Sequence, residues 1–377
     1  MTDRIYLDNA ATKPLSPKVK DYIISILDDF GNPSSLYDEG VRARYLINQA
    51  RSAVATFINA PNETNILFTP SGSASNMIAI NYALSNEIKK KYEIFYSPIA
   101  HKSILKALNG KYVNKLFVDK DGVIGTENLE NRFKSILQRT GKRPFVIIDY
   151  ANSEIGTIQP VKEIIEIVHK VGGIIYLDCT GSVSTVPLNV QCLDVDMVGF
   201  SGHKLGALKG VGVFYKKDSI VLSPLIFGTQ EQGIVSGTEN VLGIASLGRA
   251  IQNYDYSEHD CVKERNYLLQ KINTIEDTYI IGKNSDRLVN NLYVCFKGVS
   301  GEALMLYLND RRISVSTGTA CNSGEPTPSS TLIEIGIPDE DLHSCIRMTL
   351  SGEETYDKLD YVFQMIKQGV RSLRLLK

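Results

Sequence analysis

The sequence lacks two features that mark whole classes of protein: a long apolar run and an excess of charge of one sign. No stretch of about 18 consecutive apolar residues occurs, so nothing predicts a helix that crosses a bilayer. Lysine and arginine number 41 against 42 aspartate and glutamate, a formal net charge of −1. No overall field therefore draws in nucleic acid or an acidic membrane, and we expect neither as a partner. The first residues include Asp3 and Asp8 but no apolar signal-peptide core, which predicts a cytoplasmic protein.

Cysteine is scarce and unpatterned, with six residues, no CxxC pair and no histidine at metal-ligand spacing. These spacings predict neither a metal site nor a disulfide framework. Most of the thiols are expected to pack as small hydrophobic groups in a reducing compartment. The exception is Cys321, which lies within "SVSTGTACNSGEPTPSS", residues 314–330. A stretch so rich in Ser, Thr, Gly and Pro predicts a flexible loop that presents this thiol.

The length of 377 residues favours two domains, since single hydrophobic cores stop growing near roughly 250 to 300 residues. A hydrophobic fraction of 43% and a charged fraction of 22% are those of an ordinary globular protein. We expect a large domain over residues 15–251, and a smaller domain made of 1–14 and 252–377. The stretches 261–273, 287–298 and 301–316 and a closing helix over 356–377 predict that the smaller domain is α+β.

Strand-like and helical patterns alternate between residues 50 and 215. Seven short apolar runs each end in a polar or glycine-rich turn, which is typical of strands. The runs are 65–69, 93–98, 115–119, 144–150, 173–178, 197–201 and 210–215. Between them, 75–91 and 160–173 carry apolar residues at intervals of three and four, which predicts helices. The alternation predicts an α/β fold, with a mostly parallel seven-stranded sheet and helices on both of its faces.

Two polar residues stand at strand ends, where ligands of parallel sheets bind. Asp178 closes the fully apolar run 173–178, although a buried carboxylate without a partner is costly. Lys204 follows the run 197–201, and a lysine delivered into a cleft loses hydration and becomes nucleophilic. An acid for a pyridinium nitrogen and a lysine for a Schiff base describe a site for pyridoxal 5'-phosphate (PLP). A salt bridge at the sheet edge is the alternative.

Three further turns add to this hypothesis. In "FTPSGSASNMIAI" a strand runs through Ser71, Gly72 and Ser73 into a helix, which predicts a phosphate cradle of free backbone N–H groups. Small residues at a helix start are also common caps. His101 and Asn152 follow two more runs, where a ring over the cofactor and an amide beside it are suitable. A structural histidine is the alternative for His101.

The chain resembles a known family nearly from end to end. The matching stretches are "YLDNAATKPL", "FGNPSSLYDEGVRAR", "AHKSIL", "NSEIGTIQP", "SGHKLGALKGVGVFY", "SGTEN", "STGTACNSGEPTPS" and "IRMTL". They resemble the class V aminotransferases among the fold-type I PLP enzymes, and within them the NifS/IscS-type cysteine desulfurases. The resemblance implies a fold-type I PLP-dependent transferase with PLP as its cofactor.

The resemblance also implies a role for each matching residue. Lys204 would hold PLP covalently, Asp178 would pair with its pyridine nitrogen, His101 would stack on the ring and move protons, and Asn152 would place cofactor and substrate. The remaining positions are Gly72, Ser73, Ser201 and His203 for the phosphate, Thr238 for the phosphate of a second subunit in a homodimer, Thr180 beside the cofactor, and Arg347 for the substrate carboxylate.

The reaction implied by the resemblance is the conversion of L-cysteine to L-alanine. Cys321 would attack the substrate sulfur and keep it as a persulfide for a sulfur-acceptor protein, such as an iron–sulfur cluster scaffold or a tRNA-thiolation enzyme. Several positions depart from the family, among them Gly181, where it has Gln, and Val235, where it has Arg; the others are Tyr37, Ala74 and Gln232. These departures leave two alternatives open. One is a selenocysteine lyase or another β-eliminating PLP enzyme, and the other is a catalytically silent PLP-binding interaction subunit.

Overall fold

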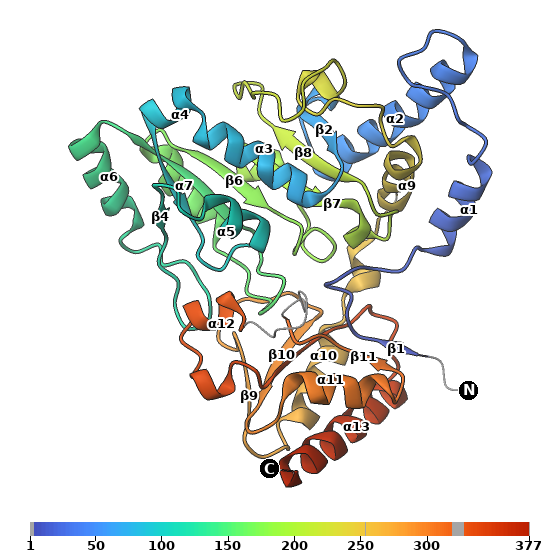
Figure 1. The fold of residues 1–377 in the computed structure, drawn as a ribbon, viewed down its shortest axis with the longest axis vertical. Coiled ribbons are helices and arrows are strands. Elements are labelled where there is room, and N and C mark those ends of the chain that lie inside the picture. Colours follow the sequence, from blue (N-terminus) through green and yellow to red (C-terminus); the bar gives the residue numbers. More distant parts are fainter. Residues whose placement is uncertain (1–3, 253, 319–327, 377) are drawn as a thin grey trace.

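A seven-stranded sheet forms the centre of the larger part of the molecule (Figure 1). The structure is a computed structural model that describes residues 4–252, 254–318 and 328–376. In spatial order the strands are β2 (Ile66–Thr69), β8 (Gly212–Lys216), β7 (Met197–Ser201), β6 (Ile174–Asp178), β5 (Arg143–Asp149), β3 (Tyr92–Tyr96) and β4 (Asn114–Lys115). Strand β8 runs antiparallel to both of its neighbours, and the other pairings are parallel. The predicted α/β fold with a mostly parallel seven-stranded sheet is confirmed.

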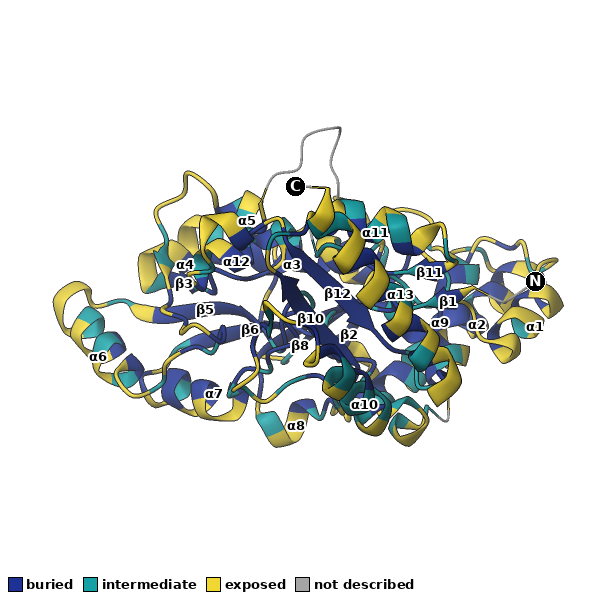
Figure 2. Ribbon diagram, turned by 90° about the horizontal axis from the view of Figure 1, so that it is seen from below, coloured by how far each residue is buried: buried dark blue, intermediate teal, exposed yellow. Residues whose placement is uncertain are grey.

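Both faces of this sheet are buried, which explains why its strands are apolar throughout. In β5, Phe145 and Ile147 pack with α3 (Gly72–Leu84) and α5 (Lys102–Leu108) on one face. Val146 and Ile148 pack into the cluster on the other face. That second face is covered by α2 (Asp38–Phe57), α6 (Leu129–Thr140), α7 (Val161–Lys170) and α9 (Val241–Ile251). Figure 2 shows the dark blue strands beneath helices whose outer surfaces are yellow.

Two predicted elements differ in the structure. The run 115–119 was expected to be a strand, but β4 ends at Lys115 and the chain then turns back on itself. A backbone hydrogen bond from Asp119 to Val123 and a bridge between Val118 and Ile124 close that turn. The helix expected over 75–91 is divided into α3 and α4 (Asn86–Lys91), because Ser85 between them has an extended backbone.

The lower part of Figure 1 contains a second, smaller core. A three-stranded antiparallel sheet has the order β12 (Cys345–Thr349), β10 (Asn291–Phe296), β9 (Thr278–Ile280). Beside it, β1 (Ile5–Tyr6) pairs in parallel with β11 (Ile313–Ser314). Helices α10 (Val262–Ile272), α11 (Gly301–Asn309) and α13 (Tyr356–Leu375) supply much of the remaining core. The N-terminal strand therefore belongs to the same hydrophobic cluster as the C-terminal third of the chain.

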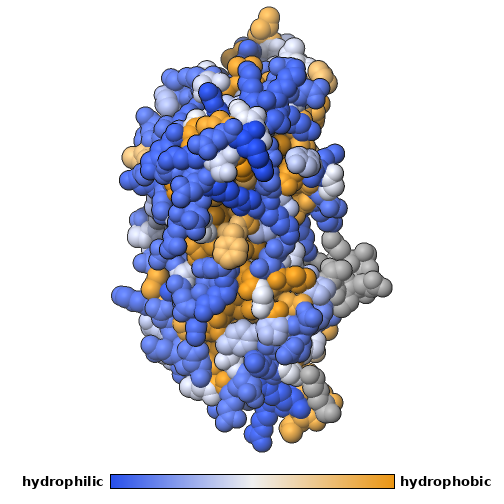
Figure 3. Space-filling view, turned by 90° about the vertical axis from the view of Figure 1, so that its left-hand side faces the viewer, coloured by the Kyte–Doolittle hydropathy of each residue, from blue (hydrophilic) through white to orange (hydrophobic). Residues whose placement is uncertain are grey.

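The remaining helices are α1 (Pro17–Ser25), α8 (Val190–Leu193) and α12 (Ser330–Glu334). Short 3-10 turns add η1 (Glu63–Asn65), η2 (Gly202–Leu205), η3 (Glu231–Gly233), η4 (Tyr256–His259) and η5 (Asp339–Asp341). On the face seen in Figure 3, hydrophilic side chains predominate, with smaller hydrophobic areas between them. No helix in the described ranges combines the length and the apolar character needed to span a bilayer.

Candidate active site

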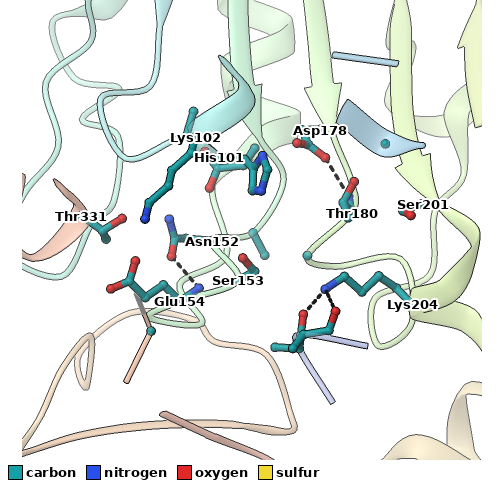
Figure 4. Close-up of a pocket in the computed structure, with 18 of the residues that line it drawn as sticks. His101, Lys102, Asn152, Ser153, Glu154, Asp178, Thr180, Ser201, Lys204 and Thr331 are labelled. Atoms are coloured by element: carbon teal, nitrogen blue, oxygen red, sulfur yellow. Dashed lines mark hydrogen bonds between the residues drawn. The ribbon is translucent and has the colours of Figure 1, made fainter. Parts of the chain in front are cut away.

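A cavity of about 590 Å³ lies at the carboxyl ends of β5, β6 and β7. Its walls come from three regions that are far apart in the sequence. The large sheet and the starts of its helices supply most of the lining, the N-terminal segment supplies Asp8, Ala10 and Ala11, and the smaller core supplies Ser316 and Arg347. Figure 4 shows labelled side chains from these walls converging on the cavity.

Lys204, in η2 directly after β7, extends its amine into this cavity (Figure 4). The amine donates hydrogen bonds to the backbone carbonyls of Ala10 and Ala11, the latter at 2.9 Å. Burial, followed by the positive charge of Arg347, lowers the pKa of Lys204 to about 8, against the opposing charges of Asp8 and Asp178. A substantial fraction of the amine is therefore neutral and nucleophilic near neutral pH.

Asp178, the last residue of β6, is 4% exposed and accepts two hydrogen bonds. The Asn76 side-chain amide donates to one oxygen at 2.8 Å, and the backbone N–H of Thr180 donates to the other at 2.9 Å. Asn76 lies one turn into α3 and is fixed in turn by the Tyr176 hydroxyl. Donors on both oxygens favour the ionised carboxylate, which suits a partner for a cationic ring nitrogen.

The start of α3 forms a small polar cradle. Ser71 caps the helix by accepting a hydrogen bond from the backbone N–H of Ala74. A Cβ on Gly72 would approach the Thr180 hydroxyl to 2.8 Å and the Ser201 Cβ to 3.3 Å, so only glycine leaves this space open. The buried Thr180 hydroxyl has no hydrogen-bond partner among the described residues. The helix dipole and the free donor fit a bound phosphate.

Two histidines line the cavity on opposite sides. His101 is the N-cap of α5, and its Nδ1 accepts a hydrogen bond from the backbone N–H of Ser103 at 3.2 Å. His203 Nδ1 lies 3.1 Å from the Thr12 hydroxyl. Burial, followed by the charges of Lys204 and Lys209, lowers the pKa of His203 to about 4, so this imidazole is neutral at physiological pH.

Asn152 shapes the wall between β5 and α7. Its side-chain amide donates to the Ile99 carbonyl at 2.7 Å, and its oxygen accepts from the backbone N–H groups of Glu154 and Ile155 at 2.9 and 3.0 Å. Burial raises the pKa of Glu154 above its usual range, against the opposing effects of Ser329, Tyr293 and Arg347. Asn152 therefore fixes the turn that presents Glu154 to the cavity.

Arg347 enters the cavity from β12 and is 7% exposed. Its guanidinium donates to the Asp8 carboxylate at 2.7 Å and to the Ser153 carbonyl at 3.1 Å. Its Nε has no partner in the described ranges, so the fork retains one buried donor. The Arg347 backbone exchanges hydrogen bonds with Ser316, which leads toward the Cys321 segment. This arrangement fits recognition of a carboxylate.

The cavity brings together most of the predicted site residues. Its lining includes Gly72, Ser73, His101, Asn152, Asp178, Thr180, Ser201, His203, Lys204 and Arg347. Thr238 is exposed and does not line the cavity of its own chain. Cys321 lies outside the described residues, although Gly318 and Ser330, on either side of its segment, line the cavity. The specific roles of these residues stay predictions.

Five cavity residues with a charged or amide side chain were not predicted from the sequence: Asp8, Asn76, Lys102, Asp149 and Glu154. Asp149 ends an apolar strand as Asp178 does, so the same signal could have found it. Asn76 follows Gly72 by one helical turn, and Lys102 and Glu154 lie beside predicted residues. Asp8 had no local signal, because only the tertiary fold brings it to Arg347.

Comparisons with known proteins agree with this geometry. The family model for "Aminotransferase class-V" matches residues 5–362. A curated relative, "Cysteine desulfurase IscS" of Methanosarcina thermophila, is 35% identical over 98% of this chain and 93% of its own length.

Two solved structures are similar over nearly the whole chain. An X-ray structure of a NifS-like protein from Rickettsia africae has a TM-score of 0.87 at 28% identity, covering 98% of this chain and 99% of that one. The structure described as SspA in complex with cysteine has a TM-score of 0.80 at 26% identity, covering 93% and 100%. With the family matched over most of its length and a close relative over nearly all of it, the chain belongs to the class V aminotransferase family.

Proposed function

We infer that this protein is a PLP-dependent cysteine desulfurase, which converts L-cysteine to L-alanine and receives the sulfur as a persulfide on Cys321. The observation that carries the proposal is the single cavity shared by Lys204, Asp178 and Arg347. A nucleophilic amine, a carboxylate with a hydrogen-bond donor on each oxygen and a carboxylate-binding guanidinium are the groups that this chemistry needs. The cysteine desulfurase relatives support the same activity.

The cavity residues fit PLP in composition and in space. Lys204 would hold the aldehyde carbon, Asp178 the ring nitrogen, and the cradle of Gly72, Ser73, Thr180, Ser201 and His203 the phosphate. When bound, PLP supplies a ring that accepts electrons from the substrate α-carbon. His101 lies at the N-cap of α5 on the cavity wall, a position suited to a ring contact.

Arg347 would bind the substrate and Lys204 would transfer protons. Arg347 would bind the substrate carboxylate through the fork that also contacts Asp8. Lys204, with its lowered pKa, would move protons at the substrate α-carbon once its amine is released. The Cys321 thiolate would attack the substrate sulfur, the carbon–sulfur bond would break, and protonation of that carbon would give alanine. Gly318 and Ser330 border the cavity, which supports the delivery of Cys321 to it.

The partners of this reaction are proposals too. L-cysteine is the substrate, and a sulfur-acceptor protein of iron–sulfur cluster assembly or tRNA thiolation takes the persulfide sulfur. A homodimer would bring Thr238 of one chain to the cavity of the other. Large apolar side chains exposed between α1 and α2 (Phe30, Leu36) and between β8 and α9 (Phe227) support such an interface, because Thr238 lies in the second of these segments.

The test compares two single substitutions in the purified yellow protein, incubated separately with cysteine and selenocysteine. We expect Cys321→Ser to abolish alanine release from cysteine and the persulfide while leaving the visible PLP absorbance. Cys192→Ser, which changes an exposed thiol that does not line the cavity, is the matched control and should behave as the unchanged protein. Alanine production is followed by chromatography, and the persulfide by mass spectrometry.

Three other outcomes of this test would each support a different conclusion. Sustained turnover by Cys321→Ser would overturn the assignment of the nucleophile. Alanine from selenocysteine alone would replace the proposal with a selenocysteine lyase. Visible PLP absorbance without alanine from either substrate would indicate a silent interaction subunit.

A further inference from the structure

A second carboxyl group lies beside Asp178 in the cavity. Asp149 is the last residue of β5, and its Cα pairs in parallel register with that of Asp178 in β6. Neighbouring strands lie about 4.8 Å apart, and residues paired in register project to the same side of the sheet. Both side chains line the cavity, and they are only 5% and 4% exposed.

The two carboxyl groups have opposite surroundings. Asp178 accepts hydrogen bonds from Asn76 and from the Thr180 backbone, which favour its charged form. Both oxygens of Asp149 are buried and have no hydrogen-bond partner within the described ranges. Two adjacent buried carboxylates cannot both ionise at low cost, and such pairs divide into an acid and a carboxylate.

Burial, supported by the negative charge of Asp178, raises the pKa of Asp149 to about 7, although Ser97 and Asn152 offset part of this. At neutral pH much of Asp149 is therefore a carboxylic acid, which has an O–H to donate. A buried donor without a partner costs free energy until a ligand supplies an acceptor. Both oxygens lack a partner in the described ranges, so a ligand that brings an acceptor into the cavity would lower this cost.

We propose that Asp149 is a positioning residue that, as a carboxylic acid, donates a hydrogen bond to the ring oxygen of bound PLP. The inference rests on the proposed function, since it requires PLP in this cavity. PLP has four polar groups: the cradle at α3 suits its phosphate, Asp178 its ring nitrogen and Lys204 its aldehyde. The phenolic oxygen beside the aldehyde is the fourth. It can accept two hydrogen bonds, so Asp149 can serve it together with Asn152.

The turn after β6 offers no competing side-chain donor at Gly181. A Cβ at this position would meet the Ala151 carbonyl oxygen at 2.6 Å, so the turn has no room for a side chain there. The other titratable or charged groups on the cavity walls are Asp8, His101, Lys102, Glu154, Asp178, His203, Lys204 and Arg347. These groups are unchanged in variants of Asp149, so a difference between variants reports on Asp149.

The test measures PLP affinity by equilibrium dialysis, together with the visible absorption of the loaded full-length protein between pH 5.5 and about 9. Asp149→Leu removes the donor, and we expect PLP to bind about tenfold more weakly, as loss of one charge-assisted hydrogen bond predicts. Asp149→Asn keeps a donor, so its affinity should stay within about threefold of the unchanged protein. Its absorption should also lose the component that titrates near 7.

Infrared difference spectra supply a readout that is independent of activity. The unchanged protein at pH 6 should show the C=O stretch of a buried protonated carboxyl group, and Asp149→Asn should lack it. Equal PLP affinity and equal pH profiles in Asp149→Leu and the unchanged protein would overturn the inference. So would a protonated-carboxyl spectrum of Asp149→Asn that equals that of the unchanged protein, since any band from Glu154 is common to both.

A different result would contradict the proposed function itself, separately from the inference about Asp149. If the unchanged protein develops no visible absorbance with PLP, or if Lys204→Ala develops the same absorbance, the site is not a PLP site. In the proposed case, the unchanged protein develops the absorbance and Lys204→Ala lacks it. If the Asp149 variants then match the unchanged protein in PLP affinity and pH profile, only the inference about Asp149 is wrong. Thermal unfolding of the two Asp149 variants checks that each is folded.

Discussion

Lys204 and Asp178 line the same cavity, but their surroundings stabilise the charge of Asp178 and destabilise that of Lys204. Asp178 receives a hydrogen bond on each oxygen, which stabilises its negative charge. Lys204 has two backbone carbonyls as partners but lies close to the positive charge of Arg347. The result is a fixed anion next to an amine that loses its proton easily, as covalent capture of an aldehyde requires.

The lowered pKa of Lys204 predicts how the rate of PLP attachment depends on pH. Only the neutral amine reacts, so the rate should rise about tenfold per pH unit below 8 and level off above it. The measurement is stopped-flow growth of the visible absorbance in cofactor-free protein between pH 6 and about 10.

One variant gives this measurement a control. Arg347→Gln removes a positive charge that lowers the pKa of Lys204, so its midpoint should move to higher pH. A midpoint near the ordinary lysine value of 10.5 in the unchanged protein would contradict the prediction.

Single residues also show how much of the site can be predicted from the sequence alone. Lys204, Asp178 and His101 were predicted as site residues because each directly follows an apolar run, and the cavity contains all three. Asp8 was not predicted, since its contact with Arg347 joins the two ends of the chain. Thr238 and Cys321 depend on a second chain and on a segment outside the described residues, so neither assignment is tested.

The turn that follows β6 explains one departure from the family at the scale of a structural element. Gly181 stands where the family has Gln, and the Ala151 carbonyl occupies the space that any side chain would need. That carbonyl belongs to the neighbouring turn after β5. The sequence revealed the replacement but not this close approach, because the approach is made by backbone from another strand.

Gly181→Ala tests this packing. We expect the substitution to lower the free energy of unfolding by about 1–3 kcal/mol, as overpacking of a closely packed site does. Gly125→Ala is the matched control, because a Cβ there meets nothing nearer than Phe117 at 3.8 Å. The control should change the free energy of unfolding by less than about 0.5 kcal/mol, and thermal denaturation followed by circular dichroism compares the two. Equal melting temperatures for the two variants would refute the packing argument.

The strand pattern itself was well predicted, with one informative exception. Runs buried on both faces became strands within a residue or two of the predicted bounds, as in β5 and β6. The run 115–119 did not, because β4 ends at Lys115 and the chain then turns back, with the backbone N–H of Asp119 bonded to the Val123 carbonyl. Apolar character alone does not distinguish a strand from a turn whose side chains are buried.

For the molecule as a whole, the two hydrophobic cores support a division into domains. We propose that residues 15–251 form the large domain and that 1–14 with 252–377 form the small one. The cluster that joins Ile5 and Leu7 to the C-terminal region supports this boundary. The cavity then lies between the domains, so a change in their relative position would change the distance between Arg347 and Lys204.

A mixing experiment tests the proposed dimer and the role of Thr238. Chains with Lys204→Ala lack their own amine, and chains with Thr238→Arg would spoil the partner's phosphate site, so each homodimer should be inactive. In a mixed dimer, the cavity of the Thr238→Arg chain has an intact Lys204 and receives an unchanged Thr238. We therefore expect unfolding and refolding the two variants together to restore alanine production from cysteine.

The size of this recovery is also predicted. Random pairing makes half of the dimers mixed, and each mixed dimer has one working site, so about a quarter of the normal activity should return. No recovery in mixtures that sedimentation shows to be mixed dimers would place Thr238 at its own chain's site or at none. A monomer in sedimentation would exclude the shared site altogether.

The parallel pairing of β1 with β11 has a consequence for how the protein is made. Ile5 leaves the ribosome long before Ile313, its partner in the ladder, has been synthesised. The backbone N–H of Ala10, whose carbonyl receives the Lys204 amine, lacks its partner Thr349 for even longer. The nascent chain can thus complete its large sheet early, yet its active centre matures only after translation has nearly finished.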